Sequence, residues 1–289
     1  MVWRQFVMEL AGLDPELVER TLDEQGALAI TLSDAGDAPV LEPKPGETPL
    51  WTQTRVTALF DEDRDMAAVT AALRTAIAPQ PLPVVRLEDL QDRVWEREWL
   101  QDFKPMRFGD RLWVAPHHEA VDAEDAVVVR LDPGLAFGTG THPTTALCLE
   151  WLDGARLEGA TLLDYGCGSG ILAIAALLLG AAEATAVDID SQAITASRNN
   201  AASNGVLSRM RFETEVDVNY DIVVANILAQ PLIENAIPIT ERLRPGGKLA
   251  LSGVLADQAD DVCAAFAHRV TFAPHRYRGD WALLAGTRN

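Results

Sequence analysis

The sequence is poor in cysteine, in long apolar runs and in export signals. Its three cysteines, Cys148, Cys167 and Cys263, are scattered without Cys-x-x-Cys spacing, which fits reduced thiols and gives no zinc site. No segment approaches the roughly 18 uncharged apolar residues of a membrane span, and the first residues lack a basic stretch followed by an apolar one. We therefore expect a cytoplasmic protein with no membrane attachment.

Metal-ligand patterns are also missing. His117 and His118 are adjacent in a polar stretch, where neighbouring side chains of an extended chain point in opposite directions. The other three histidines have no carboxylate or cysteine at the spacing of a metal site. We expect no bound metal.

Basic residues are scarce relative to acidic ones, at 24 against 43, and only three of them are lysines. The formal net charge is −19, of which residues 1–92 carry −10 and the remainder −9, and no basic face is visible. Nucleic-acid binding depends on neutralising phosphates, so we expect no direct contact with nucleic acid. The acidity is equally compatible with a basic protein partner and with simple solubility.

A glycine-rich turn is the most informative feature present. An apolar strand at 161–164 runs into glycines at positions 166, 168 and 170, and an apolar helix follows from Ile171. Glycine lets the backbone approach a ligand without Cβ clashes, and the helix begins with free N–H groups. A dinucleotide G-x-G-x-x-G motif would need glycine at 171. Taken alone, the turn is also compatible with a tight connection in any α/β sheet.

Three further segments fall where ligands bind in α/β sheets. A second strand ends in Asp188, the position at which ribose hydroxyls are held in doubly wound sheets. The strand at 221–225 delivers Asn226 to the same edge. Residues 131–145, rich in glycine and threonine, are interpreted as a binding loop whose hydroxyls can hold a carboxylate or cap a helix beginning near Pro143.

These segments occur in the order and spacing of one family. The loop at 131–145, the Asp-x-Gly-x-Gly-x-Gly turn at 164–170, the acidic strand end at 188–190 and the Asn-Ile-Leu-Ala segment at 226–229 together resemble the ribosomal protein L11 methyltransferases. The resemblance covers nearly the whole chain. It implies that S-adenosylmethionine is the cofactor and that amino groups of ribosomal protein L11, the N-terminal α-amine and lysine side chains, are the substrates. The cofactor contacts that it implies are Thr145, Gly166, Gly168, Asp188 and Asn226.

The expected fold is α/β, with a seven-stranded Rossmann-like methyltransferase domain at 106–289 and a smaller α+β ferredoxin-like domain at 1–92. A linker helix at 93–105 is expected between them. The core strands of the methyltransferase domain are predicted at 161–164, 184–188, 210–213, 221–225 and 247–252. The turn at 245–247 is predicted to lead into the last of these strands. A closing hairpin of 271–278 with 281–286 follows.

The first ninety residues have a β-α-β-β-α-β pattern, which predicts a ferredoxin-like unit. Its strands are expected near 2–10, 27–33, 51–60 and 83–87, and its helices at 15–25 and 66–78. In the family, a comparable domain recognises the protein substrate, and the resemblance implies that role here. For Trp95 and Trp99 on the linker, packing between the domains is favoured over direct contact with the substrate.

Asn226 is the candidate catalytic residue. We hypothesise that its amide accepts hydrogens of the substrate amine and directs the lone pair at the methyl group, although a strand-end cap or a cofactor contact alone explains an asparagine there equally well. The segment 226–229 has no ionisable side chain, so no general base is predicted. A methyltransferase for another substrate, such as RNA, DNA or a small molecule, and a non-catalytic cofactor-binding module stay open as alternatives. We expect a monomer.

Overall fold

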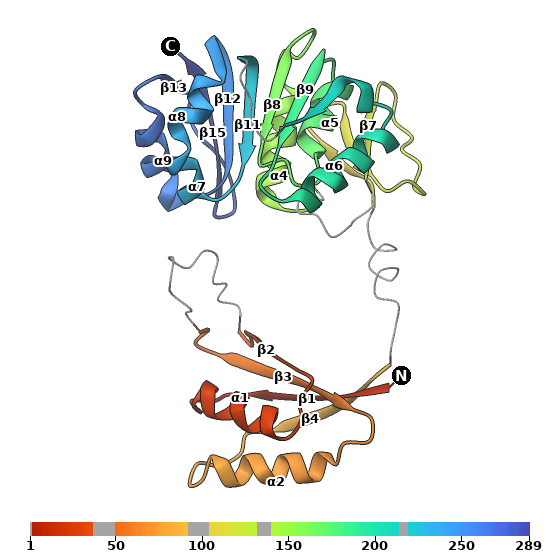
Figure 1. The fold of residues 1–289 in the computed structure, drawn as a ribbon, viewed down its shortest axis with the longest axis vertical. Helices are drawn as coiled ribbons and strands as arrows, with labels where there is room; N and C mark the ends of the chain where they lie inside the picture. The colour runs from red at the N-terminus through yellow and green to blue at the C-terminus, as the bar shows by residue number, and fades with distance from the viewer. Residues whose placement is uncertain (1, 37–49, 92–103, 132–139, 214–218) are drawn as a thin grey trace. The chain divides into compact units, whose positions relative to one another are not determined.

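A computed structural model describes residues 2–36, 50–91, 104–131, 140–213 and 219–289. The chain divides into two compact units, Met1–Trp95 and Glu96–Asn289, which are described separately (Figure 1). Of the predicted linker helix at 93–105, only the last two residues are described, so Trp95 and Trp99 lie outside the described residues. The same holds for 132–139 of the predicted binding loop.

The first unit has the predicted ferredoxin-like topology. Its antiparallel sheet has the strand order β2-β3-β1-β4, so the first and third strands lie at the centre. Both helices pack against one face of this sheet, because Phe6 and Met8 of the first strand and Val56, Ala58 and Phe60 of the third share a core with them. The elements are β1 (Val2–Glu9), α1 (Pro15–Glu24), β2 (Ala29–Asp34), β3 (Thr54–Asp61), α2 (Met66–Ala76) and β4 (Val85–Gln91).

Local signals explain the ends of these helices. Asp14 accepts a hydrogen bond from the Glu16 N–H at 3.1 Å and Pro15 occupies the first helical position. Gly26 follows the helix with a φ of +82°, a left-handed ending. Asp65 caps α2 in the same way as Asp14 caps α1. The predicted elements are present, but the last strand runs on to Gln91 instead of ending near residue 87.

The second unit begins with a small sheet that the sequence patterns did not predict. It contains β5 (Met106–Phe108), β6 (Leu112–Ala115) and β7 (Val127–Arg130) in the order β5-β6-β7. The Asp153 carboxylate at the end of a later helix, α4 (Pro143–Asp153), accepts the backbone N–H of Leu112 at 3.1 Å. This contact fastens the small sheet to the main body of the unit.

The main sheet has the strand order β10-β9-β8-β11-β12-β15-β13, and the short strand β14 pairs with β15 outside this row. Strands β8 to β12 run parallel to one another, and β15 is antiparallel to β12. The row is the predicted seven-stranded Rossmann-like arrangement. Its strands are β8 (Thr161–Tyr165), β9 (Glu183–Val187), β10 (Met210–Phe212), β11 (Tyr220–Asn226), β12 (Leu243–Leu255), β13 (Val270–Phe272), β14 (Arg276–Arg278) and β15 (Trp281–Arg288).

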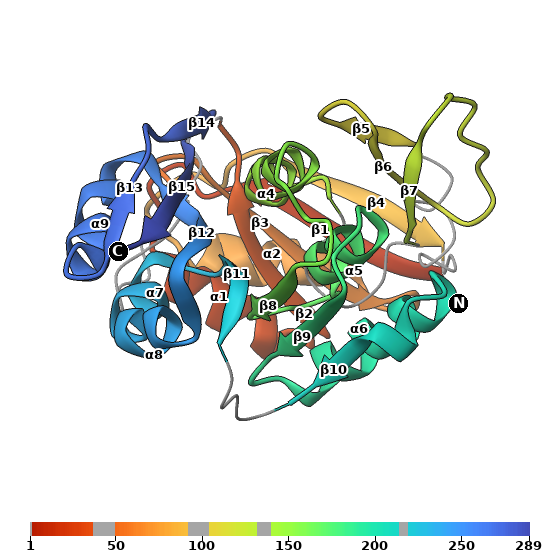
Figure 2. The ribbon, with the colours of Figure 1, turned by 90° about the horizontal axis from the view of Figure 1, so that it is seen from above.

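Helices cover both faces of this sheet. Alternate residues of a strand point to opposite faces, and Ile222 and Val224 belong to one core while Val223 and Ala225 belong to the other. Figure 2 shows the helices on the two sides of the strand row. One side has α4, α5 (Ile171–Leu178) and α6 (Ser191–Ser203), and the other has α7 (Ala229–Glu234), α8 (Ala236–Glu241) and α9 (Ala259–Phe266). No helix within the described parts of the chain is both long and apolar enough to cross a membrane.

Two predicted details of the sheet need correction. The closing hairpin of 271–278 with 281–286 is present, but its first arm is interrupted, because β13 and β14 are separated by residues 273–275 and each pairs with β15. The turn at 245–247 does not precede the fifth strand but lies inside β12. There the register with β11 shifts between the Tyr220–Leu243 and Ile222–Lys248 pairs, because the extra residues bulge out of the ladder.

Candidate functional site

The glycine turn after β8 is fastened to the end of β9. Gly166, Gly168 and Gly170 have φ values of +78°, +52° and +77°, conformations that side chains with a Cβ rarely adopt. The backbone N–H groups of Gly166 and Cys167 both donate to the Val187 carbonyl, at 2.8 and 3.0 Å. The turn is therefore held at the carboxyl edge of the sheet, where the next strand also ends.

Close packing excludes a side chain at two of these glycines. A Cβ at Gly166 would lie 2.3 Å from Cγ2 of Ile227, the residue that follows β11. A Cβ at Gly170 would lie 2.1 Å from the Ser197 hydroxyl oxygen on α6. The glycines thus allow β8, β11 and α6 to converge, which is a structural reason for the motif in addition to the predicted approach of a ligand.

Asp188 joins the glycine turn to the start of α6. Its two carboxylate oxygens accept the backbone N–H groups of Gly168 at 2.9 Å and Asp190 at 3.0 Å. Asp190 in turn caps α6 by accepting the Gln192 N–H at 2.8 Å. Asp188 is half-buried, and each carboxylate oxygen has a second lone pair that can accept a hydroxyl. The neighbouring Ile189 is fully exposed and offers an apolar surface beside these acceptors.

Thr145 and Asn226 are brought together from positions 81 residues apart. The Asn226 side-chain N–H group donates to the Thr145 hydroxyl at 3.2 Å, and Thr145 is fully buried in the first turn of α4. This bond leaves the Asn226 Oδ1 atom as the remaining acceptor of the amide. Oδ1 is buried and has no hydrogen-bond partner among the described residues. Both predicted site residues therefore meet at the carboxyl end of β11.

The start of α4 differs from the expectation in one respect. The predicted capping group was a threonine hydroxyl, but the N-cap residue is His142, whose ring Nδ1 lies 3.4 Å from the Thr144 N–H. Pro143 occupies the first helical position, as its fixed φ favours. The Thr144 hydroxyl also lies 2.7 Å from His142 Nδ1, whereas the Thr145 hydroxyl contacts Asn226.

Asp164 is a buried member of the site whose environment the sequence patterns did not reveal. One carboxylate oxygen accepts the Ala173 N–H at 3.1 Å and so caps α5, for which the N-cap Gly170 has no side chain. The other oxygen has no partner among the described residues. Burial raises the pKa of Asp164 to about 7. The Ala173 hydrogen bond opposes this rise and the charge of Asp188 adds to it.

Two buried acceptor atoms, Asp164 Oδ1 and Asn226 Oδ1, thus lie without a partner among the described residues, both at the carboxyl ends of the adjacent strands β8 and β11. Such atoms are costly unless a ligand satisfies them. S-adenosylmethionine, which the sequence resemblance implies, carries an ammonium group, ribose hydroxyls and a sulfonium charge, so the residues present fit it. No group of three or more histidine, cysteine or acidic side chains in the described parts of the chain could hold a metal.

Comparison with known proteins agrees with this geometry. Residues 2–289 match the profile of the family described as ribosomal protein L11 methyltransferase. The chain belongs to this family. It is 52% identical to the ribosomal protein L11 methyltransferase of Methylococcus capsulatus, over 99% of each chain. It is 50% identical to that of Pectobacterium atrosepticum, over 100% of this chain and 99% of the relative.

A solved structure of the same family supports the fold. The ribosomal protein L11 methylase of Lactobacillus delbrueckii subsp. bulgaricus matches with a TM-score of 0.60 at 33% sequence identity. The match covers 65% of this chain and 100% of the other.

Proposed function

We propose that this protein transfers methyl groups from S-adenosylmethionine to amino groups of ribosomal protein L11, the N-terminal α-amine and lysine side chains. The observation that carries the proposal is the match to the L11 methyltransferase family over residues 2–289, together with the convergence of the family's motif residues at one edge of the sheet. When bound, the cofactor supplies an electrophilic methyl group and leaves as a neutral thioether. A cytoplasmic, monomeric enzyme is part of the proposal.

In this proposal, Asp188 and the glycine turn hold the nucleoside part of the cofactor. The carboxylate of Asp188 accepts ribose hydroxyls, and its bond from the Gly168 N–H fixes its orientation before the cofactor arrives. The exposed side chain of Ile189 covers one face of the adenine ring. Because Gly166 and Gly168 have no Cβ, the ligand can lie close to the backbone at the ends of the strands.

Asn226 has the positioning role. Because its amide N–H is engaged by Thr145, its Oδ1 atom is the acceptor that can take a hydrogen of the incoming amine. An amine held by such a bond can direct its lone pair at the methyl group in line with the departing sulfur. Asn226 thus orients the nucleophile without taking a proton from it.

Deprotonation sets the preference between the two kinds of amine. Near pH 7, removing a proton costs about 4.6 kcal/mol for a lysine side chain but only about 1 kcal/mol for an N-terminal α-amine. The α-amine is therefore the easier nucleophile, and we propose that lysine modification requires desolvation of the ammonium group in the closed site. Water can accept the proton in either case.

The proposed domain roles follow the two units. Residues 1–92 form the substrate-recognition domain, 93–105 the linker and 106–289 the catalytic domain. Two features support a role in protein recognition for the first unit: the net charge of −10, which disfavours RNA as the partner, and the packing of its described helices on one face of the sheet. Ribosomal proteins are commonly basic, so the charge of this domain is complementary to such a substrate.

Incubation with labelled cofactor and separated ribosomal components tests the proposal. We expect label on L11 and on no other protein or RNA, with α-amine labelling faster than lysine labelling at pH 7. Label on RNA or on a different protein would show that the substrate is that component and not L11. No label on any component, with the cofactor still bound, would favour a non-catalytic module.

A further inference from the structure

A hollow lies at the edge of the main sheet opposite the proposed cofactor site. It has a volume of about 580 Å³, within the range of small-molecule binding sites. Asp221 at the start of β11 and Ala160 just before β8 belong to its lining. Asp221 and Asn226 stand five residues apart on one strand, so the hollow is roughly 17 Å from the proposed methyl-transfer site. It is therefore a separate site.

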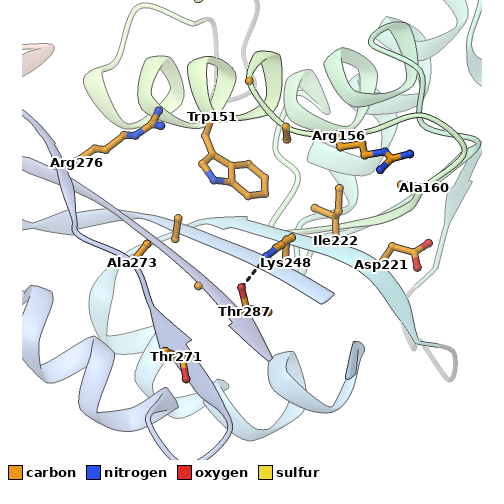
Figure 3. A pocket seen from close by; sticks show the side chains of 14 residues that line it. Trp151, Arg156, Ala160, Asp221, Ile222, Lys248, Thr271, Ala273, Arg276 and Thr287 are labelled. Atoms are coloured by element: carbon orange, nitrogen blue, oxygen red, sulfur yellow. Dashed lines mark hydrogen bonds between the residues drawn. The ribbon is translucent and has the colours of Figure 1, made fainter. Parts of the chain in front are cut away.

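The hollow exists because α4 ends at Asp153 and small residues follow. Beyond Trp151 the chain turns away at the helix cap Gly154, and the hollow lies between this end of α4 and the strands. The indole of Trp151 projects toward the strands and forms one wall (Figure 3). Much of the remaining lining is small and apolar, which leaves a flat space beside the indole: Ala155, Ala160, Ala273, Ala285 and Gly286.

Three cationic side chains surround this space. In Figure 3, Arg276 and Arg156 lie on opposite sides of Trp151, and Lys248 lies on the strands below. The Lys248 ammonium group donates to the Thr287 hydroxyl at 2.9 Å. None of the three cations forms an ion pair with another described residue, although the protein has 43 acidic residues. This contrasts with Arg278, which pairs with Glu150 at 2.6 Å.

The one carboxylate in the lining is already satisfied. Asp221 accepts hydrogen bonds from the Thr161 N–H and hydroxyl at 2.9 and 2.8 Å and from Arg244 at 2.6 Å. The lining thus combines an aromatic wall, a small apolar floor and a surplus of positive charge. Arginine binds phosphate oxygens through paired N–H donors, and aromatic side chains stack on nucleobases.

We propose that this hollow binds a free nucleoside monophosphate, with the base against Trp151 and the phosphate held by Arg276 beside it. An aromatic base matches the apolar space next to the indole, and a single phosphate matches an arginine that has no ion pair with a described residue. The net charge of −19 disfavours a longer RNA strand, whose further phosphates would meet an acidic surface.

Calorimetric titration of the full-length protein with guanosine 5′-monophosphate tests this inference. The protein is first saturated with S-adenosylhomocysteine, so that the adenosyl site at the other edge cannot take the probe. We expect one nucleotide per chain, with guanosine and ribose 5-phosphate each binding at least about tenfold more weakly, because each lacks one of the two recognised parts. Binding should weaken as salt is raised.

Variants locate the site. Arg276→Gln should weaken binding about tenfold and Trp151→Leu about fivefold or more. Arg276 is exposed, so its replacement is not expected to affect folding. The matched control is Arg74→Gln, an exposed arginine in the first unit, which should leave affinity unchanged.

Three outcomes would overturn the inference: no heat at millimolar nucleotide, equal affinity in Arg276→Gln and Arg74→Gln, or binding of a short oligoribonucleotide but not of the monophosphate. None of these outcomes depends on methyl transfer, which is measured separately with labelled cofactor.

Discussion

Asp164 and Asp221 occupy adjacent strands of one sheet and show how differently its two edges are built. Asp164, near the carboxyl edge, is fully buried with one oxygen unpartnered among the described residues, and burial raises its pKa to about 7. Burial also raises the pKa of Asp221 at the amino edge, but bonds from Thr161 and Arg244 outweigh it and leave the pKa lowered. The carboxylate at the amino edge is satisfied by the protein itself, whereas the carboxyl edge keeps buried acceptors without a partner among the described residues.

The contrast between the two edges shows where this fold tolerates polar atoms without a hydrogen-bond partner. A buried acceptor without a partner lowers the stability of the folded protein by about 1–3 kcal/mol. Selection for stability alone would remove such an acceptor. At the carboxyl edge, the proposed binding of the cofactor would offset this cost. At the amino edge the unpaired groups are solvent-exposed cations around a hollow, which cost little without a ligand.

The largest expected effect concerns Asn226. Asn226→Ala should lower turnover about 100-fold at saturating cofactor, because the amine loses the group that orients it. Thr145→Val keeps the amide but removes its hydrogen-bond partner, and should cause a smaller loss. The measurement is methyl transfer to L11 over a range of cofactor concentrations. Unchanged turnover in Asn226→Ala would contradict the positioning role and leave this residue as a strand-end cap or a cofactor contact.

The next effect compares two glycines in left-handed conformations. Gly166→Ala forces a Cβ against Ile227, next to Asn226, and should weaken binding of S-adenosylhomocysteine about tenfold or more. Gly159 near the amino edge has a similar φ of +70° and no atom within 4 Å of its added Cβ, so Gly159→Ala is the control.

Both variants should lose about 1–2 kcal/mol of stability from backbone strain, and Gly166→Ala should lose more through its clash with Ile227. Only Gly166→Ala should lose affinity. Urea unfolding and calorimetry together separate the two effects. Equal affinity losses would mean that strain alone, and not closure of the site, explains the change.

Asp188 and Asp190, at the end of β9, allow a comparison of two carboxylates near the proposed cofactor site. Asp188→Ala should weaken cofactor binding about tenfold through lost hydrogen bonds to the ribose. Asp190→Ala removes the same charge two residues away and should cost about 1 kcal/mol of stability through the lost cap of α6. Undiminished affinity in Asp188→Ala, measured by calorimetry, would refute the ribose assignment.

The smallest effect is a pH dependence of opposite sign at the two edges. Folded Asp164 holds its proton to a higher pH than the unfolded chain does, so this group lowers stability as pH rises from about 4 to about 7. Asp164→Asn should therefore gain about 1 kcal/mol relative to the parent protein between about pH 5.5 and 6.5.

Asp221 ionises more readily in the folded state, so it stabilises the protein above about pH 4, and this contribution is lost on acidification through its lowered pKa. Asp221→Asn should accordingly destabilise the protein at neutral pH, with a deficit that shrinks in acid. Urea unfolding of both variants from about pH 2.5 to 7.5 measures the trends, and parallel trends would contradict the contrast between the edges.

Much of the carboxyl edge could be predicted from the sequence because its signals are local. The apolar strand before Gly166, the pattern of three glycines and the carboxylate at Asp188 each follow from a few consecutive residues. The ferredoxin-like unit was predictable for the same reason, since Asp14 and Pro15 mark a helix start directly.

Other features depend on contacts between distant segments. Strands β5 to β7 have only three or four residues, too few to show a period. The burial of Asp164 depends on the helices packed over β8, and the sequence does not reveal which of its neighbours hydrogen-bond to it. The sequence does not indicate His142 as the N-cap of α4, because the threonine hydroxyls beside it are stronger capping signals. The hollow assembles Trp151 with Lys248 and Arg276, about 100 residues away along the chain.

Hydrogen exchange with and without S-adenosylhomocysteine tests the central claim most directly. The account predicts slower exchange of backbone amides in residues 164–173 and 186–190 when the ligand is present, with no change in residues 154–160 and 270–273 at the opposite edge. Protection confined to the opposite edge, or no protection anywhere at a saturating concentration, would contradict a cofactor site at the carboxyl ends of β8, β9 and β11.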